Sequence, residues 1–542
     1  MKHLLCLFLL AAALDVSAQT STNDLLSHVP ADADQVIHVN LQAIGSKIDL
    51  PGLINLIGSQ SKGKRSGAIF QQFLGSGLDM HQDLIVAQTN TNHPDSIKYT
   101  TVIAHITDSA KFVAFMHTIA NQDGKPLHII HPSGYAKERV ALYGEDADAW
   151  SDKLVVMTFF TLPKSSTSAE PQPGVALKAA HRAAAALHGF FNTPFITNSH
   201  ITGAFSDDAD VHLWNLHGQF SSLFKKLSHM PGMNMDQLQG MSQIMAKSKI
   251  LGESVAELRF DNGKISFRTL KYFDAGQLAA TQRMLGQGLS GELLAIVPPK
   301  QLLGVATLHW DMAAFEDTLK KNPSAGMMDS LLRSKGISID DFFHALKGDF
   351  MFLACTPEKP SANDSAPPTK LPTPVLYLVA SITDKAAFEK VATALNLKNV
   401  LTPGSDTTVT DTARHKLFSY YLIQNDLVVL GKRRQIQAFF TPGTTLDPVG
   451  KLLPEQPQKD MFNIGLDIHG FLTTVLAGMM NAPGSGAGGP MSAIQEIKTL
   501  QVSSGSIHDD AVETRIELIV GDPDKNSLTT IITLLSALGG KH

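Results

Sequence analysis

A strand–helix unit occurs twice in this chain and restricts the folds open to it. Residues 101–120, TVIAHITDSAKFVAFMHTIA, recur at 376–395 as LYLVASITDKAAFEKVATAL. Each copy begins with β-branched and apolar residues that end in Ile-Thr-Asp, and apolar residues then follow at helical spacing. The Thr-Asp pair supplies short side-chain oxygens that can accept hydrogen bonds from the first amides of a helix. We therefore predict, in each copy, a strand that leads directly into a helix.

Other segments recur in the same order, which predicts two tandem homologous halves. The strand predicted at 152–157 corresponds to the one at 426–430, and the hairpin at 255–272 corresponds to the one at 499–520. Short strands and frequent hairpins favour an α+β fold in which helices pack on a largely antiparallel sheet. We expect a signal peptide at 1–18, a first half at 19–290 and a second half at 291–542. The apolar positions predicted to face inward on the two repeated helices are Phe112, Phe115, Ile119, Phe388, Val391 and Leu395.

The first residues have the composition of a secretory signal. Lys2 and His3 form a short basic start, residues 4–13 are an apolar run, and Val16-Ser17-Ala18 is a small-residue cleavage site. The apolar run is too short to cross a bilayer and no later stretch is long enough, so we expect no transmembrane segment. Cys6 stands at the start of the run, whereas a lipid-anchor cysteine would stand at its end. We therefore expect a cleaved protein located in the periplasm or outside the cell.

Charge and cysteine content bear on partners and covalent cross-links. The formal net charge is −5 and the chain has no basic tract, which disfavours nucleic acid as a partner. Of the two cysteines only Cys355 remains after cleavage, so no disulfide can form within the mature chain. A chain of 542 residues can bury enough surface to fold without one.

Four short motifs resemble those of a family of exported Bacteroidetes proteins. They are Val29-Pro30-Ala31-Asp32-Ala33, Gly77-Leu78-Asp79, Thr107-Asp108 and Asp210-Val211-His212-Leu213-Trp214-Asn215. The family is a domain of unknown function, often found as lipoproteins and with internal duplication. The resemblance implies an envelope location and a duplicated architecture, and it brings no catalytic residues to this chain. The missing lipid-anchor cysteine departs from the family pattern, so the resemblance does not imply membrane attachment here.

The histidines are the candidate metal ligands. His181, His188 and His217 belong to a histidine-rich stretch, and His181 and His188 are seven residues apart on a predicted helix, where one face could hold both. Zinc sites need three or four converging ligands, usually at closer spacings such as i and i+4, and no such spacing occurs here. We favour surface or capping histidines over a metal site.

No catalytic set is complete in the sequence. Two segments, 59–62 and 222–225, match the Ser-x-x-Lys pattern, but the companion Ser-Asp-Asn and Lys-Thr-Gly motifs are absent. Carboxylate pairs such as Asp207-Asp208 and Asp509-Asp510 lie in predicted turns, where short acidic side chains commonly cap the backbone. We predict no catalytic residue and no cofactor.

These observations favour an exported cell-envelope protein that acts as a non-catalytic binding or scaffold module. Its partner would be an unknown envelope protein or a glycan. The alternative is an envelope hydrolase or metal-dependent enzyme whose site residues are dispersed along the chain. A stoichiometric divalent metal in the purified protein would favour that alternative.

Overall fold

The computed structural model describes the chain in separate ranges. These are residues 22–31, 33–48, 75–79, 82–89, 98–122, 124, 126–131, 138–143, 146–161, 199–205, 207–216, 253–286, 288–320, 325–357, 374–401, 418–439, 446–476 and 496–532. The chain divides into two compact units: unit 1 comprises Met1–Asn262 with Asp524–His542, and unit 2 comprises Gly263–Pro523. The two homologous halves that the sequence predicts divide at residue 290 and stay a prediction.

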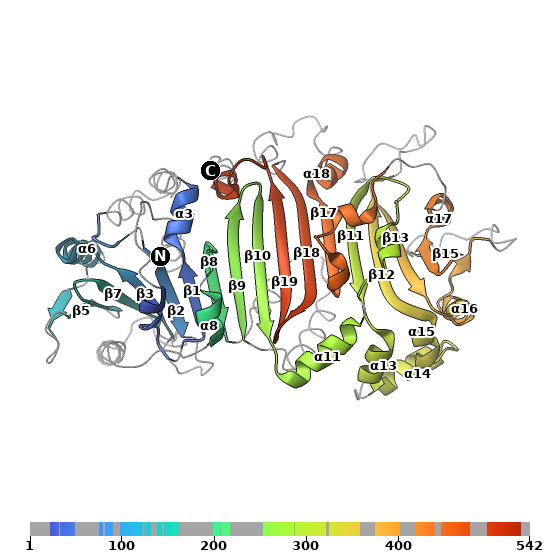
Figure 1. Cartoon of the computed structure of the whole chain (residues 1–542), viewed down its shortest axis with the longest axis horizontal. Helices are drawn as coiled ribbons and strands as arrows, with labels where there is room; N and C mark the ends of the chain where they lie inside the picture. Colours follow the sequence, from blue (N-terminus) through green and yellow to red (C-terminus); the bar gives the residue numbers. More distant parts are fainter. Residues whose placement is uncertain are drawn as a thin grey trace. The chain divides into compact units, whose positions relative to one another are not determined.

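Unit 1 contains nine described strands that pair antiparallel (Figure 1). Their order across the sheet is β9–β8–β1–β2–β3–β7–β6–β5–β4. The strands are β1 (Gln35–Val39), β2 (Leu84–Thr89), β3 (Lys98–His105), β4 (Leu127–Ile130), β5 (Arg139–Tyr143), β6 (Asp146–Trp150), β7 (Leu154–Thr161), β8 (Val211–Asn215) and β9 (Ser254–Asp261). The described helices of this unit are α2 (Thr22–Leu26), α3 (Leu41–Lys47), α6 (Ser109–Gln122) and α8 (Ser199–Ala204).

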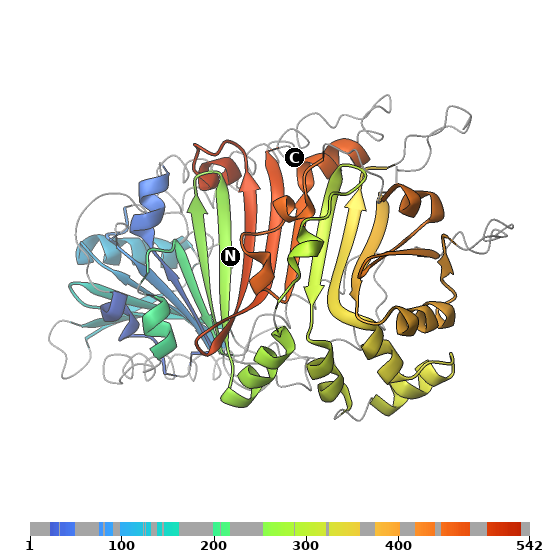
Figure 2. The same cartoon turned by 45° about the vertical axis from the view of Figure 1, so that its right-hand side comes forward.

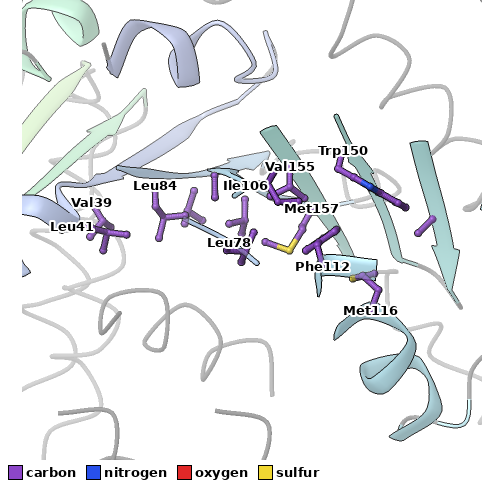
Figure 3. Close-up of a cluster of buried hydrophobic side chains, with 14 of the residues drawn as sticks. Val39, Leu41, Leu78, Leu84, Ile106, Phe112, Met116, Trp150, Val155 and Met157 are labelled. Carbon is purple, nitrogen blue, oxygen red and sulfur yellow. The ribbon is translucent and has the colours of Figure 1, made fainter. Parts of the chain in front are cut away.

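Helix α6 packs on one face of the unit 1 sheet, as the strand–helix pattern predicts. Asp108 caps the helix by accepting hydrogen bonds from two first-turn amides, both at 3.0 Å. Phe112 and Met116 on the helix belong to the same buried cluster as Trp150 and Met157 on the strands (Figure 3). The ring centres of Phe112 and Trp150 are 5.6 Å apart in an edge-to-face arrangement, which aromatic pairs favour.

Unit 2 contains ten described strands in the order β10–β19–β18–β17–β11–β12–β13–β16–β15–β14 (Figure 2). The strands are β10 (Lys264–Tyr272), β11 (Leu302–His309), β12 (Leu346–Cys355), β13 (Val375–Ile382), β14 (Lys398–Asn399), β15 (Tyr420–Gln424), β16 (Leu427–Gly431), β17 (Phe462–Asp467), β18 (Ile497–His508) and β19 (Ala511–Val520). Among these pairs only β14 and β15 run parallel.

The helices of unit 2 are mostly short. They are α11 (Ala275–Leu285), α12 (Gly291–Leu294), α13 (Met312–Lys320), α14 (Ala325–Arg333), α15 (Ile339–Ala345), α16 (Lys385–Ala394), α17 (Arg433–Phe439) and α18 (Ile468–Phe471), with 3-10 turns η2 (Val449–Leu452) and η3 (Pro457–Lys459) and a π turn η4 (Leu472–Leu476). The α+β class and the largely antiparallel sheet predicted from the sequence are confirmed for the described residues.

The unit 2 sheet has a core on each face. On one face Met351, Leu353 and Tyr377 are buried in a cluster that includes residues of η2. On the other face Phe343 of α15 and Phe388 of α16 are buried in a second cluster. This second core covers only the part of its face near α13, α15 and α16. Apolar side chains on the rest of that face are partly exposed.

The repeated helices bury nearly the face that the sequence predicts. Phe112, Phe388 and Val391 are fully buried, Phe115 and Ile119 are partly buried, and Leu395 is 52 % exposed. The prediction for Leu395 was wrong: it is the C-cap residue of α16, its amide still donates to the Val391 carbonyl at 3.0 Å, and its side chain is exposed at the end of the helix.

Candidate functional site

A chain of polar side chains crosses the sheet of unit 1, and we call it the histidine network. Its members are Asp83, His38, His212, Asp207 and Arg259. His38 on β1 and His212 on β8 stand directly opposite each other in antiparallel register, so both side chains project from the same face. They are 1 % and 0 % exposed, which closes both imidazoles off from solvent.

The contacts within the network are short. The two Nδ1 atoms of His38 and His212 are 2.9 Å apart. Nε2 of His212 lies 2.6 Å from Oδ1 of Asp207, and Nε2 of His38 lies 3.0 Å from Oδ2 of Asp83. Arg259 completes the chain, because one of its guanidinium nitrogens lies 2.8 Å from Oδ2 of Asp207.

Asp207 is held as a carboxylate by its neighbours. Partial burial raises its pKa, but the hydrogen bonds from His212 and from the Ala209 amide, together with the charge of Arg259, outweigh burial and lower the pKa to about 2. The sequence predicted Asp207 as a turn residue, and its bond to the Ala209 amide at 2.8 Å confirms this local role. The bond to His212 is an additional, tertiary role.

The sequence did not single out His38 or His212 as a pair. In the structure both faces of β1 are buried, with Val36 at 0 % exposed on one face and Val39 at 2 % on the other. The sequence does show a histidine among apolar residues in each of the two strands, β1 and β8, which could have identified the pair.

A second buried charge lies beside the network. Asp210, at 0 % exposed, receives Lys47 Nζ on both carboxylate oxygens at 2.8 and 2.7 Å. Its Oδ2 also accepts a hydrogen bond from the Phe260 amide at 2.6 Å. Lys47 ends helix α3, so this ion pair fastens α3 to the start of β8 and to β9.

Unit 2 has buried polar groups that are likewise paired with one another. His309 on β11 faces Asp349 on β12, with Nδ1 2.5 Å from Oδ1. Glu513 on β19 is 2 % exposed and contacts Arg268, Arg515 and His508 at 3.0, 2.5 and 3.1 Å. Burial raises the pKa of Glu513, but these three cationic neighbours outweigh it and hold the pKa below its usual range.

The face of the unit 2 sheet opposite η2 carries two rows of apolar residues, which we call the apolar band. The first row is Phe267, Ile516, Val502, Ile464, Ala306, Phe352 and Leu378, and the second is Ile265, Leu518, Leu500, Leu466, Gly304, Ala354 and Leu376. In each row every residue is the direct cross-strand partner of the next, so the side chains form a continuous stripe over seven strands.

The apolar band is partly exposed along most of its length, and at its β13 end Leu378 packs against the second core of this unit. Phe352 is 47 % and Leu466 38 % exposed, and every other member except Gly304 is partly exposed. The band contains no charged and no hydroxyl side chain. The next row is Thr269, Thr514 and Ser504 on β10, β19 and β18 and continues as Phe462, Leu308 and Phe350 on β17, β11 and β12, so hydroxyl side chains border the band only over its first three strands.

The metal candidates from the sequence cannot be placed. His181, His188 and His217 lie outside the described residues. Within the described ranges, no group of three or more His, Cys, Asp or Glu side chains is arranged to hold a metal ion. No helix in those ranges combines the length and the apolar character that a membrane crossing requires.

The comparisons with known proteins give no family. No family model matches the chain, and no curated protein does. The resemblance to the exported Bacteroidetes family therefore stays a prediction. Distant structural similarity is found to TP0453: its crystal form IV is 13 % identical with a TM-score of 0.29 and covers 48 % of this chain and 84 % of that chain. Crystal form III is 12 % identical with a TM-score of 0.26 and covers 49 % and 88 %. Scores of this size support no inference about function.

Proposed function

We propose that this protein is an exported, non-catalytic binding module of the cell envelope that holds a single long acyl chain on the apolar band. The observation that carries the proposal is the band itself, an uninterrupted and partly exposed apolar stripe on a folded sheet. Open apolar surface of this kind is costly in water and is typical of a binding site. The signal-like residues 1–18 support export.

The dimensions of the band favour a narrow ligand. Seven strands at a spacing of about 4.8 Å make the band about 29 Å long, and its two rows lie about 7 Å apart, so with side chains about 5 Å across the band is about 12 Å wide. The resulting area, roughly 350 Å², is below the roughly 800 Å² per partner that a stable protein interface buries. An extended acyl chain has the required length and the required narrow cross-section.

The chemistry of the band also favours an acyl chain over the protein or glycan partner predicted from the sequence. A glycan needs hydrogen-bonding side chains, and none of the fourteen positions in the two rows supplies one. For an acyl chain, burying about six methylene groups at about 0.8 kcal/mol each gives about 5 kcal/mol, enough for submillimolar affinity.

A fluorescent long-chain fatty acid titrated into the mature chain tests the proposal. The double variant Phe352→Thr/Leu466→Thr removes the two most exposed members of the band and keeps residues that suit a strand. We expect its Kd to be at least about tenfold weaker, because a tenfold change corresponds to about 1.4 kcal/mol and each removed side chain contributes on that order.

The matched control is Leu395→Thr, which removes an apolar side chain of the same unit that is more exposed than Phe352 and lies outside the band. Its affinity should equal that of the wild type. Equal affinities for wild type and double variant, or no binding by the wild type, would contradict the proposal. A glycan or a divalent metal that co-purifies in equal stoichiometry, with no extractable lipid, would also contradict it.

Strand pairing supports the two homologous halves that the proposal retains. Unit 1 pairs β1–β2, β2–β3, β3–β7, β1–β8 and β8–β9, and unit 2 pairs β11–β12, β12–β13, β13–β16, β11–β17 and β17–β18. The two lists follow the same succession. In both units a histidine of the first strand contacts an aspartate of the second strand or the residue just before it: His38 and the partly exposed Asp83 before β2, and His309 and the buried Asp349 on β12.

A further inference from the structure

The face of unit 2 that carries the apolar band also has a polar corner. Beside the band, Thr269 on β10, Thr514 on β19 and Ser504 on β18 are successive cross-strand partners. Lys271 is the next residue of β10 on the same face, because side chains of a strand alternate between its two faces. We call these four residues the polar corner. Three hydroxyls and one ammonium are thus grouped at the border of an apolar surface.

Charged side chains are distributed unequally between the two faces of these strands. On the opposite face, Glu513 and Glu517 of β19 pair with Arg268 and Lys264 of β10, in both cases at 3.0 Å. On the band face, the described residues of β10, β19, β18, β17, β11 and β12 include no carboxylate. The charge that the polar corner brings to this face is therefore the positive charge of Lys271.

Lys271 is placed for a charge interaction at the polar corner. Its Nζ lies 5.1 Å from the centre of the Phe273 ring, so an aromatic face covers one side of the ammonium. Its cross-strand neighbour on β19 is the apolar Val512. Partial burial lowers the pKa of Lys271 to about 8, so the ammonium is still charged at pH 7. An ammonium that has lost part of its hydration interacts more strongly with an anion than a fully hydrated one does.

The chemistry of the polar corner favours an anionic headgroup on the acyl chain. A cationic headgroup would be repelled by Lys271, and a neutral hydroxyl would gain nothing from its charge. A carboxylate has about four sites that accept hydrogen bonds, and an ammonium has three hydrogens to donate. The hydroxyl oxygens of Ser504 and Thr514 are 2.7 Å apart, so one donates to the other and the pair has one hydrogen left for a ligand. Hydrogen bonds between ionised groups are about twice as strong as those between neutral groups.

The polar corner lies where one end of an acyl chain on the band would be. Thr269 and Lys271 are two residues apart on β10, which is about 7 Å and within the reach of a lysine side chain. From β10 to β12 the sheet extends over five strand spacings, about 24 Å. Over the last three of these strands the row of hydroxyls continues as Phe462, Leu308 and Phe350. A single chain can therefore place its headgroup at the corner and its tail on these apolar residues.

We propose that the polar corner binds the carboxylate of a fatty acid, with the ammonium of Lys271 as its charge partner and with Thr269 and the Ser504–Thr514 pair as hydrogen-bond donors. The inference rests on the proposed function, because it adds a headgroup and a direction to the acyl chain on the apolar band. The ligand is a single-chain carboxylate that runs from β10 toward β12.

Two fluorescent ligands that share one long tail, and end in a carboxylate or in a primary alcohol, test the headgroup site by titration into the mature chain at pH 7. The wild type should bind the carboxylate at least about tenfold more tightly than the alcohol. Lys271→Met should weaken carboxylate binding to near the alcohol value and leave alcohol binding unchanged. Lys271→Arg should restore most of the preference, because arginine keeps the positive charge.

The matched control is Lys264→Met, because Lys264 lies on the same strand, faces the other way and pairs with Glu517. This variant should keep the wild-type preference for the carboxylate. Equal affinities of the wild type for the two ligands would overturn the headgroup site. So would a carboxylate preference that survives Lys271→Met, or one that is removed instead by Lys498→Met at the β-bulge of β18. In these cases the alcohol still binds and the acyl-chain proposal stands, whereas failure of both ligands to bind would contradict both proposals.

Discussion

At the scale of single residues, Asp148 is a carboxylic acid enclosed in the core of unit 1. It is 0 % exposed on β6, and neither carboxyl oxygen has a hydrogen bond of ordinary geometry. Burial raises its pKa well above the ordinary value, so the native state holds the protonated form. The unfolded chain ionises with a pKa of about 3.9, so unfolding releases a proton at higher pH.

This gives Asp148 a stability effect of definite sign. The contribution of Asp148 to the free energy of unfolding is most favourable below pH about 4. It is lost as the pH rises toward the raised native pKa. Asp148→Asn should therefore stabilise the protein at pH 8 by at least about 1 kcal/mol, and by less at pH 5. Urea unfolding at both values measures the difference, with the exposed Asp152→Asn as the control. A gain that is the same at both pH values would disprove the assignment.

Lys47 is expected to matter for stability far more than an ordinary surface lysine. Its removal in Lys47→Met leaves the fully buried Asp210 carboxylate without a cation, which typically costs about 3–5 kcal/mol. The Phe260 amide still solvates one oxygen, so we expect the lower end of that range. In chemical unfolding, Lys47→Met/Asp210→Asn should recover part of the loss. Additive losses in the double variant would refute the coupling.

At the scale of elements, Gly77 connects two of the sequence motifs, Gly77-Leu78-Asp79 and Thr107-Asp108, which contact each other in the fold. The carbonyl of Gly77 accepts hydrogen bonds from the Thr107 amide at 2.8 Å, the Thr107 hydroxyl at 3.0 Å and the Asp108 amide at 3.1 Å. The turn is thereby docked onto the point where β3 becomes α6. Two motifs that the sequence shows separately are one contact in the fold.

The same glycine yields a prediction at this scale. Gly77 has a φ of +79°, and a Cβ there would stand 2.2 Å from the carbonyl oxygen of Asp108, so Gly77→Ala requires the backbone to move. We expect a loss of about 3 kcal/mol or more in thermal or urea unfolding. Gly336, at φ +83° with open space around it, is the matched control. Gly336→Ala should cost only about 1–2 kcal/mol for its left-handed backbone, and equal losses would show that the close contact is unimportant.

The strand–helix elements were accessible from sequence because their signals are local. The cap at Asp108 and the buried Phe112, Phe388 and Val391 follow from side-chain chemistry within one turn of helix. The strand β6 was not predicted, because Asp146 and Asp148 interrupt the alternation that identifies a strand. Its pairing with β5 and β7 overrides that weak local preference.

At the scale of the whole molecule, Cys355 reports on the opening of unit 2. It is 0 % exposed in a core shared with Met351 and Tyr377, and burial raises its pKa to about 12. The thiolate is the reactive form, so the native protein should resist alkylation at pH 8. Mass spectrometry should show no adduct until denaturant unfolds unit 2, and one adduct afterwards. Leu395→Cys provides an exposed thiol that should react at once; rapid native labelling of Cys355 would contradict the buried core.

Much of the architecture follows from sequence because periodicity, caps and turns act over a few residues. The strand–helix units, the α+β class and the largely antiparallel pairing were predictable in this way. The signal peptide and the duplication are also predicted from the sequence, and both stay predictions. The metal candidates His181, His188 and His217 lie outside the described residues and stay untested.

Only the tertiary structure could show the candidate sites, because each depends on strand register. His38 and His212 are 174 residues apart, and their contact exists because β1 pairs with β8 without a slip. The apolar band joins seven strands between residues 264 and 520, and a shift of one residue in any pair would turn that strand's side chains to the other face. Local patterns determine which residues alternate, whereas long-range pairing determines which of them meet.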